Sequence, residues 1–417
     1  MSKRRLVFAS GVANTFEWYD YALFGHFAPI IGAKFFPDAS PSSSLLHAFL
    51  AFAIGYLMRP IGGIFFGILG DKFGRRTALS AAIFCMSLPT ALIGILPTYE
   101  SIGITATILM IIVRMVQGLA MGGALTGSIS FVIEHTKPAN RGFSGSISMS
   151  SICIGILFGS GVSQLIQYFL TVEQFNSWGW RVPFLLGIFI LFAGNYIRKY
   201  TSETPSFEGI KEEGKILKSP LKKVISTYWF DMLISIFINS TGSVIFYLQA
   251  IYLMSFLRVN RNFTETDISS LANYCYLIMA IITLGAGYLS DKIGRKQIFI
   301  INLLLIIGVT PFLLQIFEEK SFYFVIIAQI VLSILAASYI GPEPALQAEF
   351  YPVNVRNTAL SLSYNTATSI FGGTTPLALE YVVQKTGTIT SATYYVIACA
   401  ILSLISLYFY KDRSKFS

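Results

Sequence analysis

The sequence predicts an all-α membrane protein in which twelve transmembrane helices form two six-helix bundles related by pseudo-symmetry. Composition is the first reason: 54% of the 417 residues are hydrophobic, only 12% are charged, and the mean hydropathy is +0.65. Soluble domains carry about twice that share of charge. The second reason is that apolar runs of about 20 residues, each able to cross a ~30 Å hydrocarbon core, recur along the whole chain. The third is a polar motif that appears twice.

The duplicated motif is Gly67-Ile-Leu-Gly-Asp-Lys-Phe-Gly-Arg-Arg76, which returns as Gly287-Tyr-Leu-Ser-Asp-Lys-Ile-Gly-Arg-Lys296. In both copies an apolar helix ends at an Asp, the chain turns at a Gly, and basic residues precede the next apolar run. A cationic cluster between two membrane-length helices is typical of the cytoplasmic face. Two copies at equivalent places indicate a duplicated protein whose halves move against each other.

A second pattern, an acid followed seven residues later by an arginine, also recurs. Glu134 and Arg141 follow the fourth apolar run, and Glu349 and Arg356 follow the tenth. The two Glu/Arg pairs are separated along the chain by nearly the same number of residues as the two motif copies. A short insertion in one half accounts for the small difference. The two repeats together predict six helices in each half.

In the N-terminal half, the first helix follows a basic segment without a small-residue cleavage site, so we expect it to be retained rather than removed as a signal peptide. A Pro- and Ser-rich loop at 37–44 ends it, the first motif ends the second helix, and a polar turn at 134–141 ends the fourth. A Trp-Gly-Trp-Arg segment at 178–181 leads into the sixth. We expect these helices at 6–31, 46–70, 77–96, 104–132, 143–170 and 182–196.

In the C-terminal half, the second motif ends the eighth helix, and Pro342 and Pro344 interrupt the tenth. Gly372, Gly373 and Pro376 form a candidate hinge in the eleventh. We expect these helices at 228–257, 268–289, 297–317, 322–346, 358–383 and 392–410. The longest polar connection separates the halves, so the predicted domains are an N-terminal bundle at 1–197, a cytoplasmic linker at 198–227, a C-terminal bundle at 228–410 and a short cytoplasmic tail at 411–417.

The charge distribution predicts the orientation. Of the 30 Lys and Arg residues, 22 fall on the termini and on the connections that share their side, six fall on the opposite connections, and two lie within spans. The positive-inside rule then places both termini in the cytoplasm, and a bacterial inner membrane is the expected location. The net charge of +9 is explained in this way without a nucleic-acid partner. All four cysteines fall inside predicted spans, so packing is expected rather than disulfides, and no metal or cofactor pattern appears.

Six motifs give the chain a resemblance to a known family. They are Glu17-Trp-Tyr-Asp20, Arg59-Pro-Ile-Gly-Gly63, Arg114-Met-Val-Gln-Gly118, Trp178-Gly-Trp-Arg-Val-Pro-Phe184, Glu203-Thr-Pro-Ser-Phe207 and Glu349-Phe-Tyr-Pro352 with Arg356. Together they cover nearly the full length. The chain resembles the major facilitator superfamily and, within it, the metabolite:proton symporters, which include proline/betaine, α-ketoglutarate, citrate and shikimate permeases. The resemblance does not fix the substrate.

The first helix carries two acids inside the membrane, and an ionisable side chain there costs at least ~2.5 kcal/mol on insertion scales. Asn14, Glu17 and Tyr21 fall on one helix face, with Asp20 about 60° to the side. Burial makes such a carboxylate easier to protonate and a nearby cation opposes this, which suits a proton-coupling group. A static ion pair that fixes helix packing is the alternative.

The natural cation for these acids is Arg114, with Gln117 on the same helix face. The resemblance implies a proton-coupling unit made of Glu17, Asp20 and Arg114. Between the acids, we expect Asp20 to carry the proton and Glu17 to pair with Arg114. In this scheme, protonation releases Arg114 or changes how it holds substrate.

Further polar residues within spans are candidates for substrate binding. Arg59 could hold an anionic group or pair with an acid of the eleventh helix, and Glu343, flanked by prolines, could set substrate preference or act as an inner gate. Together with groups named above, the predicted substrate-binding residues are Asn14, Tyr21, Arg59, Arg114, Gln117, Asn239, Tyr247, Gln249, Glu343, Tyr364 and Asn365. Hydrogen bonding between helices is the alternative for the polar residues of the seventh and eleventh helices.

The repeated charges predict a gate that latches the cytoplasmic ends of the two halves in an outward-open state. Its predicted residues are Asp71, Arg75, Arg76, Glu134, Arg141, Asp291, Arg295, Glu349 and Arg356. Topology control by positive charge would explain the lysines but not the paired aspartates.

These features predict a proton-coupled secondary transporter that imports a small polar metabolite by alternating access. Charges of both signs suit a zwitterion such as proline or betaine, and the two buried arginines suit an organic acid about as well. A proton-driven exporter and a transport-inactive membrane sensor are the alternatives. An enzyme is not expected, because the sequence has no nucleotide-binding loop, nucleophile elbow or metal cluster. The expected partners are the substrate, the proton and the lipid bilayer, and we expect a monomer.

Overall fold

The computed structural model describes residues 3–38, 41–260, 263–318 and 322–411, and within them the regular secondary structure is entirely helical. The predicted tail, apart from Lys411, and part of the predicted loop at 37–44 lie outside these residues. Five long helices open the N-terminal half. They are α1 (Lys3–Phe35), α2 (Pro41–Phe73), α3 (Arg75–Ile95), α5 (Ile104–His135) and α6 (Arg141–Phe169).

The sixth predicted helix is built from pieces, because the backbone changes from α to 3-10 geometry near its start. These pieces are α8 (Arg181–Leu185), η3 (Leu186–Phe189) and α9 (Ile190–Tyr200). Short turns connect the long helices: α4 (Tyr99–Ile102), η1 (Pro138–Asn140), α7 (Val172–Gln174) and η2 (Phe175–Gly179). The connection between the halves forms two short helices, α10 (Pro205–Glu212) and α11 (Pro220–Thr227).

The C-terminal half repeats the six-helix plan with more interruptions. The seventh helix is α12 (Trp229–Tyr247), η4 (Leu248–Tyr252) and α13 (Leu253–Asn260), and the next two are α14 (Glu265–Ile293) and α15 (Arg295–Ile316). The tenth is α16 (Phe322–Ile340) and α17 (Glu343–Glu349). The last two are α18 (Arg356–Ala367), η5 (Thr368–Gly372) and α19 (Gly373–Thr386), then η6 (Ile389–Ser391) and α20 (Ala392–Phe409).

Two predicted interruptions are present. The tenth helix stops at Ile340 and restarts at Glu343, as the flanking prolines require. In the eleventh, the backbone widens into π geometry at η5, which ends at Gly372, the first glycine of the pair that we expected to act as a hinge. Such π segments are frequent at functional sites.

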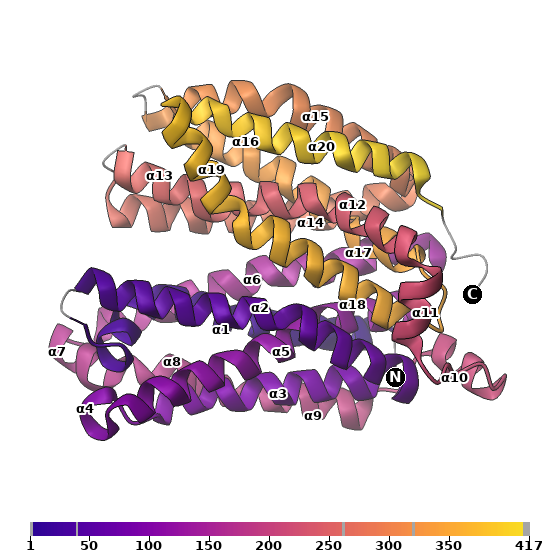
Figure 1. Ribbon diagram of the computed structural model, residues 1–417, viewed down its shortest axis with the longest axis horizontal. Helices are drawn as coiled ribbons and strands as arrows, with labels where there is room; N and C mark the ends of the chain where they lie inside the picture. The colour runs from indigo at the N-terminus through magenta and orange to yellow at the C-terminus, as the bar shows by residue number, and fades with distance from the viewer. Residues whose placement is uncertain (1–2, 39–40, 261–262, 319–321, 412–417) are drawn as a thin grey trace.

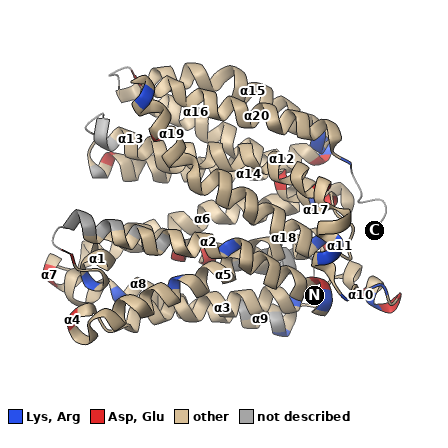
Figure 2. Cartoon of the chain, in the orientation of Figure 1, with Lys and Arg blue, Asp and Glu red and all other residues tan. Residues whose placement is uncertain are grey.

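The two halves lie as two layers with their helices running lengthwise, the N-terminal half below and the C-terminal half above in Figure 1. The linker helices α10 and α11 lie at the end of the molecule where α1 begins and α20 ends, and we call this the linker end. Lys, Arg, Asp and Glu gather at the linker end, while the middle of the bundles is almost free of them (Figure 2).

Membrane crossing is supported by the helices themselves. Within the described residues, ten are long and apolar enough to span a bilayer. Of the twelve predicted spans, the first and the eleventh do not meet that criterion. The first carries Glu17 and Asp20, and the eleventh carries Asn357 and Asn365. Both are thus spans in which polar groups face the protein interior.

Glycines set how closely the helices approach. A Cβ on Gly118 or Gly122 of α5 would overlap the backbone of α2 at Gly55 or Arg59, so these glycines let the two helices pack in direct backbone contact. Gly74, between α2 and α3, has φ of 105°, and its repeat Gly294 has φ of 108°. A side chain is strained in that conformation, which explains why both hairpins turn at glycine.

The halves meet along two symmetry-related pairs of helices. α2 packs against α18, and α14 packs against α6. Each pair joins the second helix of one half to the fifth helix of the other. The charged motifs lie at the ends of these four helices, so any change in the motifs acts directly on the contact between halves.

Candidate functional site

The two repeated aspartates bind helix N-termini across the interface. Asp71, at the end of α2, accepts backbone N–H bonds from Asn357 at 3.2 Å and Thr358 at 2.8 Å in the first turn of α18. Asp291, at the end of α14, accepts from Gly142 and Phe143 in the first turn of α6, both at 2.8 Å. A helix N-terminus carries partial positive charge and free N–H groups. Each aspartate therefore fastens its own half to the other.

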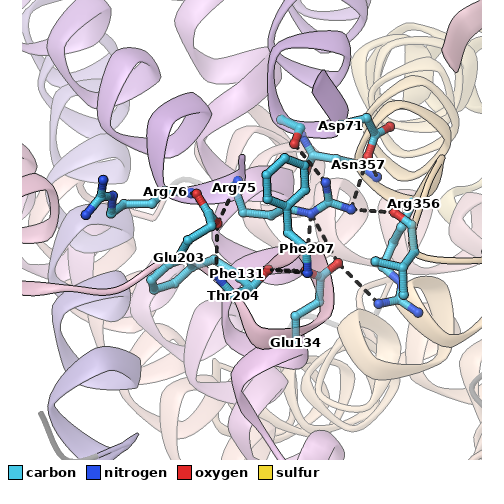
Figure 3. A network of polar contacts seen from close by, with 12 residues as sticks. Asp71, Arg75, Arg76, Phe131, Glu134, Glu203, Thr204, Phe207, Arg356 and Asn357 are labelled. Atoms are coloured by element: carbon cyan, nitrogen blue, oxygen red, sulfur yellow. Dashed lines mark hydrogen bonds and ion pairs between the residues drawn. The ribbon is translucent and has the colours of Figure 1, made fainter. Parts of the chain in front are cut away.

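Arginines and glutamates complete each of these two sites. Arg75 is fully buried between Asp71 and Glu134, at 3.2 Å from each, and Glu134 also pairs with Arg356 at 3.2 Å (Figure 3). On the symmetry-related side, Arg295 pairs with both Asp291 and Glu349, and Arg141 Nη1 lies 3.8 Å from Glu349. We call these eight residues the end network: Asp71, Arg75, Glu134, Arg356, Asp291, Arg295, Glu349 and Arg141.

Arg76 departs from the expected gate. It does not join the end network: its Nη1 donates to the carbonyl oxygen of Thr201 at 3.0 Å, and its backbone N–H donates to Glu203. The physical reason is that Arg75 and Arg76 are adjacent on a helix and therefore point about 100° apart. Only Arg75 faces the other half.

The segment after α9 is a part of the site that sequence reasoning did not assign. Glu203 accepts from the backbone N–H of Arg75 at 2.9 Å, and Thr204 Oγ1 donates to Glu134 at 2.6 Å. The Phe207 ring lies 5.1 Å from the guanidinium carbon of Arg75 (Figure 3). The motif Glu203-Thr-Pro-Ser-Phe207 was the available signal, but its partners lie in distant parts of the chain.

A buried polar chain joins α1, α5 and α3 in the middle of the N-terminal half. Arg114 Nη1 lies 3.7 Å from Asp20 and donates to Gln117 at 2.6 Å. Gln117 in turn donates to Asp20 at 2.9 Å and to Thr90 at 2.9 Å. The guanidinium also lies 4.0 Å from the ring centre of Phe24. Asp20 is thus the acid that Arg114 and Gln117 hold in place.

Glu17 has a different environment from the one expected. Its side chain is 2% exposed, and in the described part of the chain neither carboxylate oxygen has a hydrogen-bond partner. Its electrostatic neighbours are Arg59 and Asp20. The expected pairing of Glu17 with Arg114 is therefore wrong, because the two acids point in different directions from α1 and Asp20 is the one that faces α5. Asn14, one turn along, donates to Ser128 at 2.9 Å, and a small cavity of about 10 Å³ lies beside Asn14 and Glu17.

Arg59 links the halves at the level of Glu17. Its Nε donates to Asn365 Oδ1 at 3.3 Å, and Asn365 Nδ2 donates to the carbonyl oxygen of Gly122 at 2.7 Å. Among the described residues, Nη1 of Arg59 has no hydrogen-bond partner. Its partner on the eleventh helix is thus an amide rather than an acid, and one edge of the buried guanidinium stays available.

Tyrosines surround Arg59 on the side away from the end network. The guanidinium carbon of Arg59 lies 5.0 Å from the ring centre of Tyr56, whose hydroxyl contacts that of Tyr247 on α12. The rings of Tyr21 and Tyr56 are 5.8 Å apart. Tyr364 has Glu343, Arg59, Tyr56 and Glu17 as electrostatic neighbours. Tyr56 was missed by sequence reasoning, since an isolated tyrosine in an apolar run gives no signal.

Three predicted residues lie deeper in the C-terminal half. Glu343 is 3% exposed, and a Cβ on Gly242 would lie 3.2 Å from its Oε2. Asn239 accepts from Ser243 within its own helix at 2.8 Å. Gln249 of η4 contacts Ser333 and Gln329 of α16, so its hydrogen bonds hold η4 and α16 together. In the described part of the chain, no group of His, Cys, Asp and Glu residues could hold a metal ion.

Family models match both halves of the chain. The model described as Sugar (and other) transporter matches residues 6–223, and the Major Facilitator Superfamily model matches residues 232–416. The chain belongs to the major facilitator superfamily. Membership makes it a multi-pass membrane transporter, and the superfamily is not a class of enzymes.

Relatives within the superfamily extend over nearly the whole chain. A putative proline/betaine transporter of Staphylococcus haemolyticus is 33% identical over 96% of this chain and 86% of its own length. The proline/betaine transporter of Escherichia coli K12 is 30% identical over 97% of this chain and 82% of its own length. The resemblance to the metabolite:proton symporters is thereby confirmed.

Solved structures confirm the predicted twelve-helix fold. The proton:xylose symporter XylE, bound to 6-bromo-6-deoxy-D-glucose, aligns with a TM-score of 0.77 over 98% of this chain and 94% of its own, at 17% identity. The human organic anion transporter MFSD10 aligns with a TM-score of 0.71 over 98% of this chain, at 16% identity. At such identities, the likeness concerns the fold alone.

Proposed function

We propose that this protein imports a small zwitterionic metabolite together with a proton, by alternating access across a bacterial inner membrane with both termini in the cytoplasm. The central observation is that, among the described residues, the carboxylate of Glu17 and Nη1 of Arg59 both lack a hydrogen-bond partner, while Arg59 acts electrostatically on Glu17. The names of the relatives, proline/betaine transporters, agree with a zwitterion. The substrate, the coupling and the direction are parts of this proposal.

The balance of buried charge favours one proton and a neutral substrate. In the middle of the bundles, away from the helix ends, the described core holds three buried carboxylates and two buried guanidinium groups: Glu17, Asp20, Glu343, Arg59 and Arg114. With all five ionised the core is left with one negative charge, which one proton cancels. A zwitterion keeps that balance, whereas a dicarboxylate adds two negative charges that the site cannot compensate. Uncompensated charge inside a membrane protein is costly, so the zwitterion is the better fit.

Competition for Arg59 can couple the proton to the substrate. A buried carboxylate without a partner is expensive to hold as an anion, so Glu17 takes up a proton. The free edge of Arg59 is then available to the carboxylate of the substrate. When Glu17 loses the proton, its charge competes for the same guanidinium and weakens the hold on the substrate. Asp20, held by Arg114 and Gln117, keeps α1 and α5 in register during this exchange.

On this proposal, the structure represents a state closed on both sides of Arg59. The end network is the cytoplasmic latch: one arginine of each site, Arg356 or Arg141, comes from the opposite half, so opening separates an ion pair across the interface and exposes its charges to water. The contact between Tyr56 and Tyr247 closes the opposite side. Tyr364, near both Arg59 and Glu343, then lines the substrate site between them. Opening one closure while the other holds gives alternating access.

Uptake into proteoliposomes tests the proposal. Purified protein is reconstituted, a pH difference is imposed with the acidic side outside, and accumulation of labelled proline, glycine betaine, α-ketoglutarate and citrate is compared. We expect accumulation of a zwitterion that collapses when a protonophore is added, and loss of that uptake in Arg59→Lys, which cannot present the same planar edge. Accumulation of a dicarboxylate alone, or of nothing across the panel, would contradict the proposal.

A further inference from the structure

A row of hydroxyl groups lies inside the N-terminal half and has no part in the mechanism above. Ser10 Oγ of α1 lies 2.6 Å from Ser128 Oγ of α5, and Ser128 Oγ lies 3.4 Å from Ser148 Oγ of α6. All three side chains are buried. Asn14 Nδ2 also donates to Ser128 Oγ, at 2.9 Å. Three helices of one half therefore meet at the hydroxyl of Ser128.

Asn14, which donates to the row at Ser128, lies one helical turn from Glu17. Ser10, Asn14 and Glu17 occupy one face of α1, and Ser10 lies about 10 Å nearer the linker end than Glu17 does. The cavity of about 10 Å³ beside Asn14 and Glu17 has room for about one water molecule. The amide of Asn14 and the unpartnered oxygens of Glu17 supply the polar contacts that such a water needs.

We propose that Ser10, Ser128 and Ser148 form the route by which Glu17 releases its proton toward the linker end, through the interior of the N-terminal half. This inference rests on the proposed function, in which Glu17 carries the proton. The O–H of Glu17 gives its proton to the water, and when the Asn14 amide turns away from Ser128 that water passes a proton to the Ser128 hydroxyl. Ser128 releases its own proton to Ser10 or Ser148, and that serine releases one to water at the linker end. Glu17 is left as a carboxylate with Arg59 as its neighbouring cation.

The position of α6 links this route to the opening of the latch. Ser148 lies about 10 Å along α6 from Arg141, at the linker end. The same helix contacts α14 of the other half through its first turn and through Ser150, whose hydroxyl donates to the carbonyl oxygen of Ala280 at 2.8 Å. Separation of α6 from α14 admits water toward Ser148. In the closed state the route has no contact with bulk water. It reaches bulk water only when the linker end opens, and this prevents a proton leak.

Alanine substitutions in the row provide the test, with Ser163→Ala as the matched control. Ser163 is another buried serine of α6, but its hydroxyl donates only within its own helix, to Gly159 at 2.8 Å. In proteoliposomes, we expect Ser128→Ala to slow proton-driven uptake about tenfold, the effect of one lost hydrogen bond in a proton-transfer barrier. Counterflow exchange of substrate should be unchanged, because the loaded carrier keeps its proton in that assay. Ser128→Thr, which retains a hydroxyl, should restore uptake.

The outcomes separate this inference from the proposed function. A larger solvent deuterium isotope effect on uptake in Ser128→Ala than in the wild type would support the route, since proton transfer would then limit the rate. Wild-type uptake in both Ser128→Ala and Ser10→Ala would overturn it, as would equal losses of uptake and exchange in variants with a normal melting temperature. If the wild-type protein shows no proton-driven uptake, the proposed function itself fails.

Discussion

Asp71→Asn perturbs the latch with little change in shape. The substitution removes the charge that accepts two N–H bonds from α18, and it removes the ion pair with Arg75. Hydrogen bonds to a charged group are worth about 1.5–3 kcal/mol each, and an anion at a partly buried helix N-terminus adds up to ~2 kcal/mol. An asparagine oxygen keeps one weaker bond. We therefore expect the closed latch to lose about 2–4 kcal/mol, which changes its equilibrium by roughly 30- to 1,000-fold.

Cysteine labelling reads out this shift. Ser361 is buried behind the latch and its hydroxyl lies 2.7 Å from that of Thr126, so a Ser361→Cys reporter in a cysteine-free background is protected while the latch is closed. In inside-out vesicles, Asp71→Asn should raise its labelling rate by a membrane-impermeant maleimide at least tenfold. Asp291→Asn should act in the same direction, and Glu100→Gln, at an exposed position, should not. Unchanged labelling in both aspartate variants would refute the latch.

Three further predictions concern coupling, the linker and helix packing. Glu17→Gln should abolish accumulation driven by a pH difference and keep substrate exchange, as measured in proteoliposomes; a variant that still accumulates substrate would remove Glu17 as the proton carrier. Thr204→Val removes the hydroxyl that donates to Glu134 and should lower the apparent melting temperature by about 1–2 °C, consistent with a loss of about 1–2 kcal/mol; equal melting would contradict the bond. Gly122→Ala should destabilise the fold by at least ~1–3 kcal/mol, whereas Gly308→Ala, where a Cβ meets no atom within 4 Å, should be neutral; equal effects would contradict the packing argument.

The fold could be predicted from the sequence because its determinants are local. Apolar runs set the spans, glycine marks the hairpin turns at Gly74 and Gly294, and the prolines beside Glu343 mark the break in the tenth helix. The repeated motifs predict that the two six-helix halves are related by pseudo-symmetry. The fine structure of the sixth, seventh and eleventh helices was not predictable, since changes to 3-10 or π geometry depend on packing rather than on local composition.

The end network was predictable in its members but not in its bonds. The sequence suggests side-chain pairs such as Asp71 with Arg75, and this pair is present. The bonds from each aspartate to a helix N-terminus of the other half depend on contacts between positions 287 and 148 apart in the chain. Such a contact has no signature in a single sequence, and neither does the bond from Thr204 to Glu134.

The central site shows where helical periodicity reaches its limit. The pattern put Glu17 and Asp20 on adjacent faces of α1, but it could not say which face turns toward Arg114. The structure gives that place to Asp20 and leaves Glu17 beside Arg59. Gln249 shows the same ambiguity, since the sequence around a polar residue in a span is the same whether that residue lines a cavity or, as here, joins η4 to α16.

The ratio of protons to substrate tests the central claim most directly, because the charge balance of the core requires one proton for each neutral substrate. It can be measured in proteoliposomes that contain a pH-sensitive dye, by comparing acidification of the lumen with uptake of labelled zwitterion. We expect one proton per substrate molecule in the wild type and no substrate-dependent acidification in Glu17→Gln. Uptake of the zwitterion without acidification, or the same ratio in both proteins, would contradict the account.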